Sequence, residues 1–262
     1  MQTSPLSPAE TLRWYITAGI DEAIGEQPVD RYAQSAKPAA KASAPAAPGT
    51  VPAAPRGEPE AATSAHLAQS VTTLAELKAA MEAYEGCALK RTCQQTVFAD
   101  GDPSARLMIV GEAPGADEDR LGLPFVGASG RLLDRMLAAI GLDRKTQAYI
   151  TNVVPWRPPG NRKPEPAEVE LCKPFIARHI ELVNPAVLLL LGGASVSALL
   201  ARTDSITRLR GGFVDYSSAR LARPIPAMPT FHPAYLLRTP LAKREVWRDL
   251  LLVRQKLDKT NV

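Results

Sequence analysis

The sequence has few cysteines and no long apolar stretch, and both absences limit what the protein can be. Three cysteines among 262 residues are too few, and odd in number, for a framework of disulfide bonds, and they fit a reducing compartment. No run reaches the roughly 18 apolar residues of a transmembrane helix, and residues 1–5 do not begin a secretion signal. We therefore expect a cytoplasmic protein with no membrane association.

The common phosphate-binding loops are also missing. Residues 111–127 are rich in glycine, but they contain neither the Gly-Lys-Ser/Thr ending of a P-loop nor the Gly-x-Gly-x-x-Gly of a dinucleotide fold. This disfavours an unrelated α/β enzyme that binds nucleotides through such a loop. The formal net charge of +4 suits an anionic partner but does not identify one.

Composition divides the chain into three parts. Residues 1–27 contain a candidate short helix, capped by Ser7 with Pro8 at its first position, which either docks a protein partner or has no role in chemistry. Residues 28–70 are dominated by Ala, Pro and Ser. Such a segment has too few large apolar side chains to offset the entropy of ordering it, so we expect a disordered linker. Residues 71–262 have the patterning of a globular domain.

Within the globular part, apolar strands alternate with helices. Thr73 and Glu76 have the spacing of a capping box, which predicts a helix start. The remaining pattern predicts strands at residues 106–110, 148–154, 186–191 and 228–231, and helices at residues 130–140, 166–183 and 243–256. This alternation predicts an α/β fold of three layers, α/β/α, with a central, mainly parallel sheet. In such sheets ligands bind beyond the carboxyl ends of the strands.

The segment after the first predicted strand has the composition of a pocket wall. Residues 111–115 read Gly-Glu-Ala-Pro-Gly and residues 124–127 read Pro-Phe-Val-Gly. Glycines and prolines that bend the backbone beside several carboxylates suggest a rigid wall from which Phe125 projects. An acidic surface loop with Phe125 tucked into the core is equally consistent with this segment alone.

Polar and cationic residues follow the later strands. The amide of Asn152 can read a base edge bidentately, and Arg157, Arg162 and Lys163 stand between prolines in a stiff loop suited to phosphates. His232 follows the last predicted strand and is one of three histidines, which makes it a candidate for acid–base or electrostatic work. Taken singly, each of these features is more often structural or plain surface.

Together, in order and spacing, these segments resemble the family 4 uracil-DNA glycosylases of the uracil-DNA glycosylase superfamily. The motifs that carry the resemblance are Gly-Glu-Ala-Pro-Gly with Pro-Phe-Val-Gly, Thr-Asn-Val-Val with Arg-Pro-Pro-Gly-Asn-Arg, and His-Pro-Ala-Tyr-Leu-Leu-Arg. The resemblance extends from Cys87 to the C-terminus. It implies the fold of that family and a base excision repair hydrolase that flips uracil out of DNA and cleaves its N-glycosidic bond, leaving an abasic site.

The resemblance also implies roles for individual residues. His232 donates to the uracil oxygen that becomes negative, Asn152 hydrogen-bonds the pyrimidine edge and rejects cytosine, and Phe125 stacks on the flipped base. Further implied pocket residues are the catalytic Glu112 with Ala113 in the loop that places the attacking water, Gly115, and Glu118 near the pyrimidine ring. The implied DNA contacts are Arg157, Arg162, Ser195 at a helix N-terminus, and Leu236, Leu237 and Arg238, which fill the gap left in the duplex.

The cysteines depart from the family pattern. Family 4 members hold a [4Fe-4S] cluster with four cysteines, and here Cys87 and Cys172 match two of those positions while Tyr84 and Trp156 occupy the other two. We expect a degenerate site without bound metal, in which the two rings fill the volume of the cluster. A zinc site built from Cys87, Cys93, Cys172 and His179 is an alternative whose spacing fits no standard pattern.

Position 113 bears on the expected chemistry. Family 1 relatives carry an aspartate there that orients water, and Ala113 cannot do so, which leaves more of the catalysis to His232 and Asn152. We expect a monomeric enzyme whose partner is uracil-containing DNA. A non-catalytic module of the same fold that binds damaged DNA is the alternative, and the presence of Asn152, Phe125 and His232 argues against it.

Overall fold

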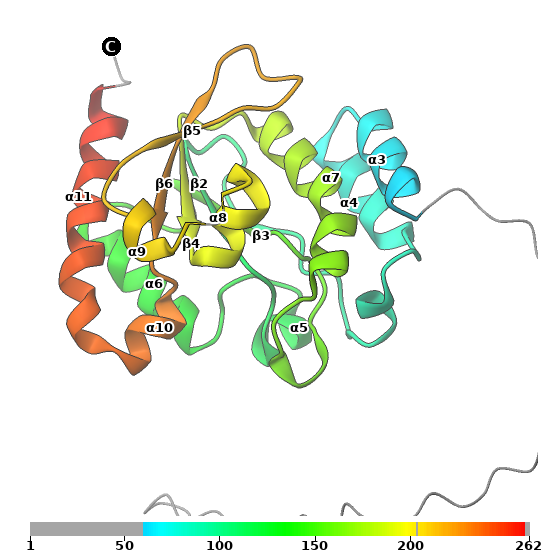
Figure 1. Ribbon diagram of the computed structural model, residues 1–262, viewed down its shortest axis with the longest axis horizontal. Coiled ribbons are helices and arrows are strands. Elements are labelled where there is room, and N and C mark those ends of the chain that lie inside the picture. The colour runs from blue at the N-terminus through cyan, green and yellow to red at the C-terminus, as the bar shows by residue number, and fades with distance from the viewer. Residues whose placement is uncertain (1–59, 203, 260–262) are drawn as a thin grey trace, which may run out of the picture. The chain divides into compact units, whose positions relative to one another are not determined.

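A computed structural model of the chain describes residues 60–202 and 204–259 (Figure 1). The candidate helix in residues 1–27 and the linker up to residue 59 lie outside the described residues. The end of the predicted linker is helix α3 (Glu60–Ser70), so the prediction of disorder was wrong for this stretch. Ser64 and Ala68 are 0% and 2% exposed, and such small side chains let α3 pack closely against helix α7 (Pro166–Val183).

One sheet of six strands runs through the described residues in the order β1-β3-β2-β4-β6-β5. The strands are β1 (Asp100–Gly101), β2 (Leu107–Gly111), β3 (Ala148–Asn152), β4 (Val187–Leu191), β5 (Val214–Tyr216) and β6 (Ile225–Thr230). The four central strands are parallel, whereas β1 and β5 pair antiparallel at the two edges. The mainly parallel sheet is confirmed; the sequence did not predict the two edge strands or the beginning of β6.

Helices cover both faces of the sheet (Figure 1). Successive side chains of a strand point to opposite faces, and accordingly Met108 and Val110 join one apolar core while Leu107 and Ile109 join another. The first core is closed by α3, α4 (Leu74–Ala83), α7 and α8 (Gly193–Leu200). The second core is closed by α6 (Ala128–Ala139), α10 (Pro233–Arg238) and α11 (Lys243–Lys259). This is the three-layer arrangement that the sequence predicted.

The predicted helix starts and ends agree closely with the structure. The capping box at α4 is formed, because the Glu76 amide donates to Thr73 Oγ1 at 3.1 Å and the Thr73 amide donates to Glu76 Oε2 at 3.2 Å. The shorter helices are α5 (Ala116–Leu121), α9 (Ile206–Leu209) and the 3-10 helices η1 (Ala88–Arg91), η2 (Pro159–Asn161) and η3 (Pro240–Ala242). Among the described residues no helix combines the length and apolar character needed to cross a bilayer.

Candidate active site

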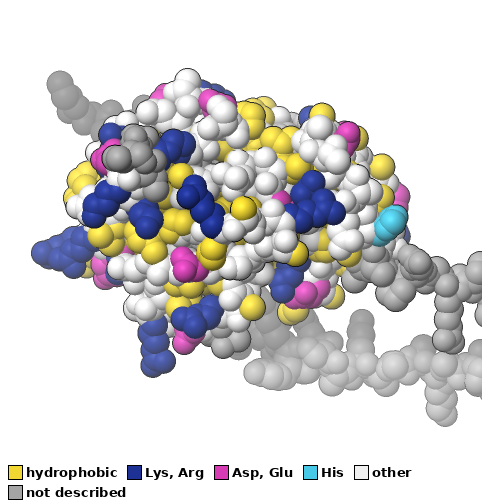
Figure 2. Space-filling view, turned by 90° about the horizontal axis from the view of Figure 1, so that it is seen from above, with side chains coloured by type: hydrophobic (Ala, Val, Ile, Leu, Met, Phe, Trp, Pro, Cys, Tyr) yellow, Lys and Arg dark blue, Asp and Glu magenta, His cyan; other side chains and the backbone are white. Residues whose placement is uncertain are grey.

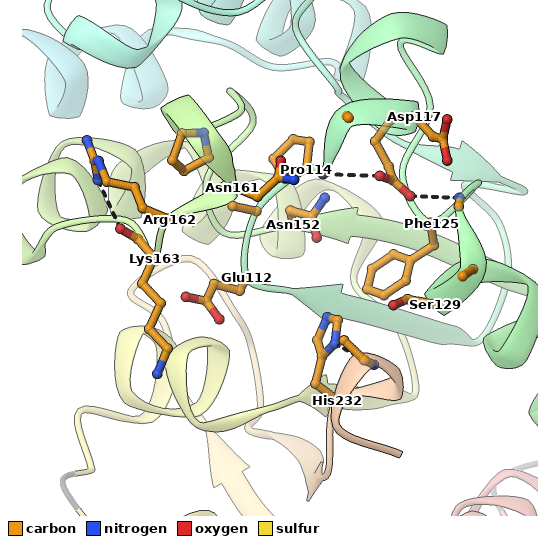
Figure 3. A pocket seen from close by; sticks show the side chains of 18 of the residues that line it. Glu112, Pro114, Asp117, Phe125, Ser129, Asn152, Asn161, Arg162, Lys163 and His232 are labelled. Carbon is orange, nitrogen blue, oxygen red and sulfur yellow. Dashed lines mark hydrogen bonds between the residues drawn. The ribbon is translucent and has the colours of Figure 1, made fainter. Parts of the chain in front are cut away.

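A cavity of about 640 Å³ opens at the carboxyl ends of the parallel strands, where the sequence predicted ligand binding. Glu112 follows β2, Asn152 ends β3, and His232 follows β6, so three strands deliver a polar side chain to one space (Figure 3). The predicted site residues that line the cavity are Glu112, Ala113, Gly115, Glu118, Phe125, Asn152, Arg162, His232 and Arg238.

Gly111 allows the two neighbouring strands to place their side chains together. It pairs with Asn152 in the register of β2 and β3. A Cβ atom at this position would collide with Asn152 Oδ1 and lie 2.6 Å from Phe125 Cζ. Only glycine therefore fits between the amide and the ring, a requirement that the sequence alone does not reveal.

Asn152 is nearly buried, with 5% of its surface exposed. Its Oδ1 is the one buried side-chain nitrogen or oxygen in the described part of the chain that lacks a hydrogen-bond partner. Buried polar groups are nearly always paired, so an exception needs an explanation. Because this amide lines the cavity, the missing partner is one that a ligand can supply.

Phe125 is held in an unusual backbone conformation beside His232. Its φ of 53° lies in the left-handed region, which is disfavoured for a bulky residue. Arg144 secures it by donating to the carbonyl oxygen of Phe125 at 2.8 Å and to that of Pro124. Gly130 leaves room for the same carbonyl, because a Cβ there would overlap it. The ring both closes the second apolar core and lines the cavity, 5.5 Å from the imidazole of His232 between ring centroids.

Glu118 ties two parts of the cavity wall together. Its Oε1 accepts hydrogen bonds from the amides of Val126 and Gly127, both at 2.9 Å, and its Oε2 accepts from the Gly115 amide at 3.1 Å. The carboxylate that was expected near the pyrimidine ring is thus committed to three backbone donors. It fixes the residues that follow Phe125 relative to the start of α5.

His232 is a neutral hydrogen-bond donor in this site. Burial and, to a smaller extent, the charge of Arg238 lower its pKa to about 4, against the opposing charge of Glu118. The ring caps α10 by accepting a hydrogen bond from the Ala234 amide at Nδ1, at 3.1 Å. Since the neutral ring carries one proton, that proton sits on Nε2. The free Nε2–H is available to the cavity.

Glu112 is a half-buried carboxyl on the wall of the cavity. Burial raises its pKa above the usual range, and the charge of Lys163 opposes this shift. Figure 3 shows Glu112 between Lys163 and His232. Ala113, beside it on the cavity wall, has no polar atom in its side chain. A carboxyl whose pKa is raised takes up a proton more readily than an ordinary one.

The two arginines predicted to bind DNA make different contacts. Arg162 lines the cavity, and its guanidinium donates to both carboxylate oxygens of Glu168, at 2.8 and 2.6 Å. Arg157 does not line the cavity: it donates to Asn161 Oδ1 at 2.8 Å and lies 3.7 Å from the carboxylate of Asp119. Both arginines tie the loop that follows β3 to a neighbouring helix, Arg162 to α7 and Arg157 to α5.

The remaining predicted DNA contacts are divided between surface and core. Leu237 is 46% exposed next to the cavity-lining Arg238. Leu236 is 1% exposed in the second apolar core, so the expectation that it fills a gap in the duplex was wrong. Ser195 is fully buried, and its hydroxyl donates to the Gly192 carbonyl at 3.0 Å, which leaves only the backbone at this helix start for a phosphate.

The region expected to resemble a cluster site is packed with aromatic rings. Tyr84 and Trp156 stack at 6.1 Å between centroids, and Tyr84 also meets Phe175 edge-on at 5.3 Å. Trp156 is fully buried and donates to Thr96 Oγ1 at 3.1 Å. Because these rings occupy two of the four expected ligand positions, the residues present do not fit a cluster held by four thiolates.

The three cysteines each contact a partner within the protein. Cys87 and Cys172 are buried and hydrogen-bond each other, which lowers the pKa of Cys87 to about 7. Cys93 bonds the Lys90 carbonyl at 3.3 Å, and His179 bonds the Tyr149 hydroxyl at 2.9 Å. Among the described residues no three His, Cys, Asp or Glu side chains are placed to hold one metal ion, so the alternative zinc site is not assembled.

Comparison with known proteins agrees with this geometry. A sequence profile described as Uracil DNA glycosylase superfamily matches residues 98–251, a range that contains every residue of the cavity. The type-4 uracil-DNA glycosylase of Sulfurisphaera tokodaii is 37% identical over 188 residues, which cover 70% of this chain and 84% of the relative. The type-4 uracil-DNA glycosylases of Thermotoga maritima and Archaeoglobus fulgidus are each 40% identical, over 58% and 62% of this chain and 77% and 82% of the relatives.

Proposed function

The chain belongs to the uracil DNA glycosylase superfamily, and we propose that it excises uracil from DNA by cleaving the N-glycosidic bond, leaving an abasic site. The observation that carries this function is the unpartnered Oδ1 of Asn152, buried in the same cavity as Phe125 and His232. An unpaired buried acceptor costs about 1–3 kcal/mol of stability. A base that supplies the missing donor explains why the protein keeps an unpaired acceptor at this position.

Uracil offers the groups that the cavity requires. Its N3–H can donate to Asn152 Oδ1, and its O4 can accept from the side-chain nitrogen of the same amide. Cytosine has no proton on N3 and carries an amino group in place of O4, so both contacts become unfavourable in this orientation. Stacking on Phe125 adds about 1–3 kcal/mol for any base. Phe125 therefore contributes affinity and Asn152 contributes selectivity.

His232 supports the departure of the base. When the bond between C1′ of the sugar and N1 of uracil breaks, its electron pair moves onto the base and negative charge builds up on O2. The Nε2–H of the neutral His232 is the donor that can reach such an oxygen from the cavity wall. One preorganised donor of this kind is worth roughly 10²–10³ in rate.

Glu112 completes the hydrolysis by handling water. After the base leaves, the sugar carbon is electron-poor and a water molecule adds to it, releasing one proton. The half-buried Glu112 carboxylate lines the cavity with a raised pKa, which favours proton uptake. Since the methyl group of Ala113 cannot orient water, the stabilisation of the leaving base by His232 and Asn152 carries most of the acceleration.

No step of this reaction requires a metal or a cluster. Relatives of type 4 carry a [4Fe-4S] cluster in the region where this chain has the stacked rings of Tyr84 and Trp156. Here the packing of these rings stabilises that region. We propose that the enzyme acts without this cofactor, as a monomer in the cytoplasm, with uracil-containing DNA as its partner. The described cysteines, all of them free thiols, are consistent with a reducing compartment.

The experiment that tests the function is cleavage of a uracil-containing oligonucleotide by the purified chain, followed by alkali to break abasic sites. We expect cleavage that persists in the presence of a chelator and is absent on the matching cytosine oligonucleotide. His232→Ala and Asn152→Ala should each lose roughly 10²-fold or more in rate. Arg223→Ala changes an exposed residue at the end of the sheet opposite the cavity, so it is the control and should keep full activity.

The competing function is a module that grips damaged DNA without cutting it. Tight binding of uracil DNA by the wild-type chain with no alkali-sensitive product would establish that alternative. The neutral His232 with a free Nε2–H argues for catalysis, because mere binding of a flipped base gains little from a donor aimed at charge that develops only as the bond breaks.

A further inference from the structure

One stretch of the surface beside the cavity combines exposed apolar side chains with free cations. Seven large hydrophobic residues are exposed among the described residues, and five of them lie between positions 235 and 251. They are Tyr235, Leu237, Leu241, Trp247 and Leu251, with exposures of 38%, 46%, 91%, 42% and 41%. We call this stretch, which comprises α10, η3 and the first half of α11, the 235–251 segment. Such a concentration marks an interaction surface.

The charge of the 235–251 segment is strongly positive toward solvent. Arg238, Lys243, Arg244 and Arg248 form no ion pair or hydrogen bond through their side chains with any described residue. The two carboxylates of the segment are both drawn to Arg210, which lies 3.1 Å from Glu245 and 2.7 Å from the buried Asp249. Arg210 thus neutralises the two carboxylates from inside the protein. The four cations of the segment remain available to bind a partner.

The 235–251 segment starts at the cavity and leads away from it. Arg238 lines the cavity. Helix α11 begins at the same end of the sheet, where the parallel strands finish, and runs toward the end where they start (Figure 1). Lys and Arg side chains also lie on that opposite end of the domain (Figure 2), so positive charge alone does not distinguish the segment. Its distinction is the alternation of cations with a tryptophan and exposed leucines, continuous with the site.

We propose that the 235–251 segment is a track for the DNA strand that flanks the flipped uracil. Trp247 stacks on an unpaired base, while Arg244 and Arg248 hold phosphates. Aromatic side chains interleaved with cations are the general means of binding a single strand without reading its sequence. Trp247 and Leu251 are one helical turn apart on one face, and the first two turns of α11 extend about 11 Å.

This inference rests on the proposed function, and the test separates the two. Single-stranded oligonucleotides carry uracil with either a short or a long flank, added on the 5′ side or on the 3′ side. For the full-length wild-type chain we expect kcat/KM to rise with the flank on one side only. Trp247→Ala should reduce the ratio of long-flank to short-flank kcat/KM about tenfold, and Trp247→Phe should restore most of it.

The phosphate contacts have their own readout. Arg244→Ala and Arg248→Ala should each lower the slope of log affinity against log salt concentration by about 0.7 for the long oligonucleotide. Arg223→Ala removes an exposed cation from the opposite edge of the sheet and should change neither the slope nor the flank ratio. These comparisons use the same substrates and the same buffer.

The following results decide whether the 235–251 segment is such a track. A wild-type chain with no gain from either flank, or a Trp247→Ala variant with an unchanged flank ratio, overturns the track. A uniform loss on short and long substrates in Trp247→Ala also overturns it, because that loss would reflect the fold. Binding to cytosine oligonucleotides, read by fluorescence anisotropy, reports the track without excision; flank-dependent binding with no excision of uracil would sustain the track and defeat the proposed function.

Discussion

The ring of Phe125 and the imidazole of His232 lie 5.5 Å apart between centroids, tilted by 32°. They come from segments more than a hundred residues apart in sequence, one between α5 and α6 and one after β6. A base stacked on Phe125 would present its edge to His232 and to Asn152, which ends β3. The parallel sheet, by bringing the carboxyl ends of its strands to one end, thus joins motifs that are separate in sequence into one pocket.

Substitution of Gly111 should show how far excision depends on the close packing of Asn152 against Phe125. A methyl group there collides with Asn152 Oδ1 and crowds the ring of Phe125, so we expect Gly111→Ala to lower kcat/KM at least tenfold. The cost in stability should be about 1–3 kcal/mol. Gly212→Ala is the matched control, since its Cβ would meet no atom within 4 Å. Excision and urea unfolding of both variants check the prediction; equal activity in the two would contradict it.

Asn152→Ala should trade activity for stability. The wild-type Oδ1 is buried without a partner, so its removal relieves a desolvation cost that partly offsets the lost packing. We expect excision to fall roughly 10²-fold or more, while the free energy of unfolding stays within about 1 kcal/mol of wild type. Urea denaturation and single-turnover excision measure the two quantities. Destabilisation well beyond this range would show that the amide serves the fold and not a ligand.

The central strands and long helices could be predicted because their signals are local. β2, β3 and β4 are buried throughout, and a continuous apolar run between turn residues predicts such strands. The edge strand β1 has two residues, both only half-buried, and exists through pairing with β3. Helix α3 likewise depends on contact with α7. Composition alone cannot show a packing partner that is distant in sequence.

The candidate site was predicted in the same uneven manner. Phe125, Asn152 and His232 could be placed because each lies in a recognisable motif, at the end of a strand or in the segment that leads on from one. Arg144 could not, because it acts on the Phe125 carbonyl across 19 residues of sequence. The burial of Leu236 could not be predicted either. Leu236 is buried and its neighbour Leu237 is exposed only because of the direction in which α10 packs. Motifs identify chemistry, whereas the supports of that chemistry follow from tertiary contacts.

Two buried histidines should make the protein sensitive to acid. Burial lowers the pKa of His179 to about 3 and that of His232 to about 4, from a reference of 6.5. Below the reference value the unfolded chain takes up protons that the folded chain refuses, so stability falls as pH drops from 6.5 toward 5. Each histidine contributes up to about 1.4 kcal/mol per pH unit. Urea unfolding across this range measures the slope, and His179→Gln should remove about half of it; an unchanged slope would refute the assignment.

The aromatic packing at Tyr84 and Trp156 predicts a colourless protein. Purified under anaerobic conditions, the chain should contain no stoichiometric iron or sulfide and should lack the visible absorption of a cluster. Trp156→Ala should destabilise the fold by about 3–5 kcal/mol, because a large, fully buried ring is removed. Iron analysis and thermal unfolding test the two statements separately. A stoichiometric cluster in the wild-type protein would overturn the assignment of this region to packing.

Arg144 should position Phe125 through hydrogen bonds that a lysine cannot reproduce. Its guanidinium bonds the carbonyls of Pro124 and Phe125 and pairs with Asp100 at 2.7 Å and with Asp134 at 2.9 Å. A lysine keeps the charge but has one compact donor group in place of the planar fork. We therefore expect Arg144→Lys to retain most of the stability and to release the left-handed conformation of Phe125.

The consequence for catalysis follows from what Phe125 does. If its ring stacks on the base, a misplaced ring weakens binding of substrate and transition state alike, so KM should rise about tenfold with a smaller change in kcat. Lys145→Met is the matched control: Lys145 also pairs with Asp100, at 2.7 Å, but it is exposed and contacts neither carbonyl. A purely structural Arg144 would produce the opposite pattern, with unfolding at lower urea concentration and an unchanged KM for the molecules that remain folded.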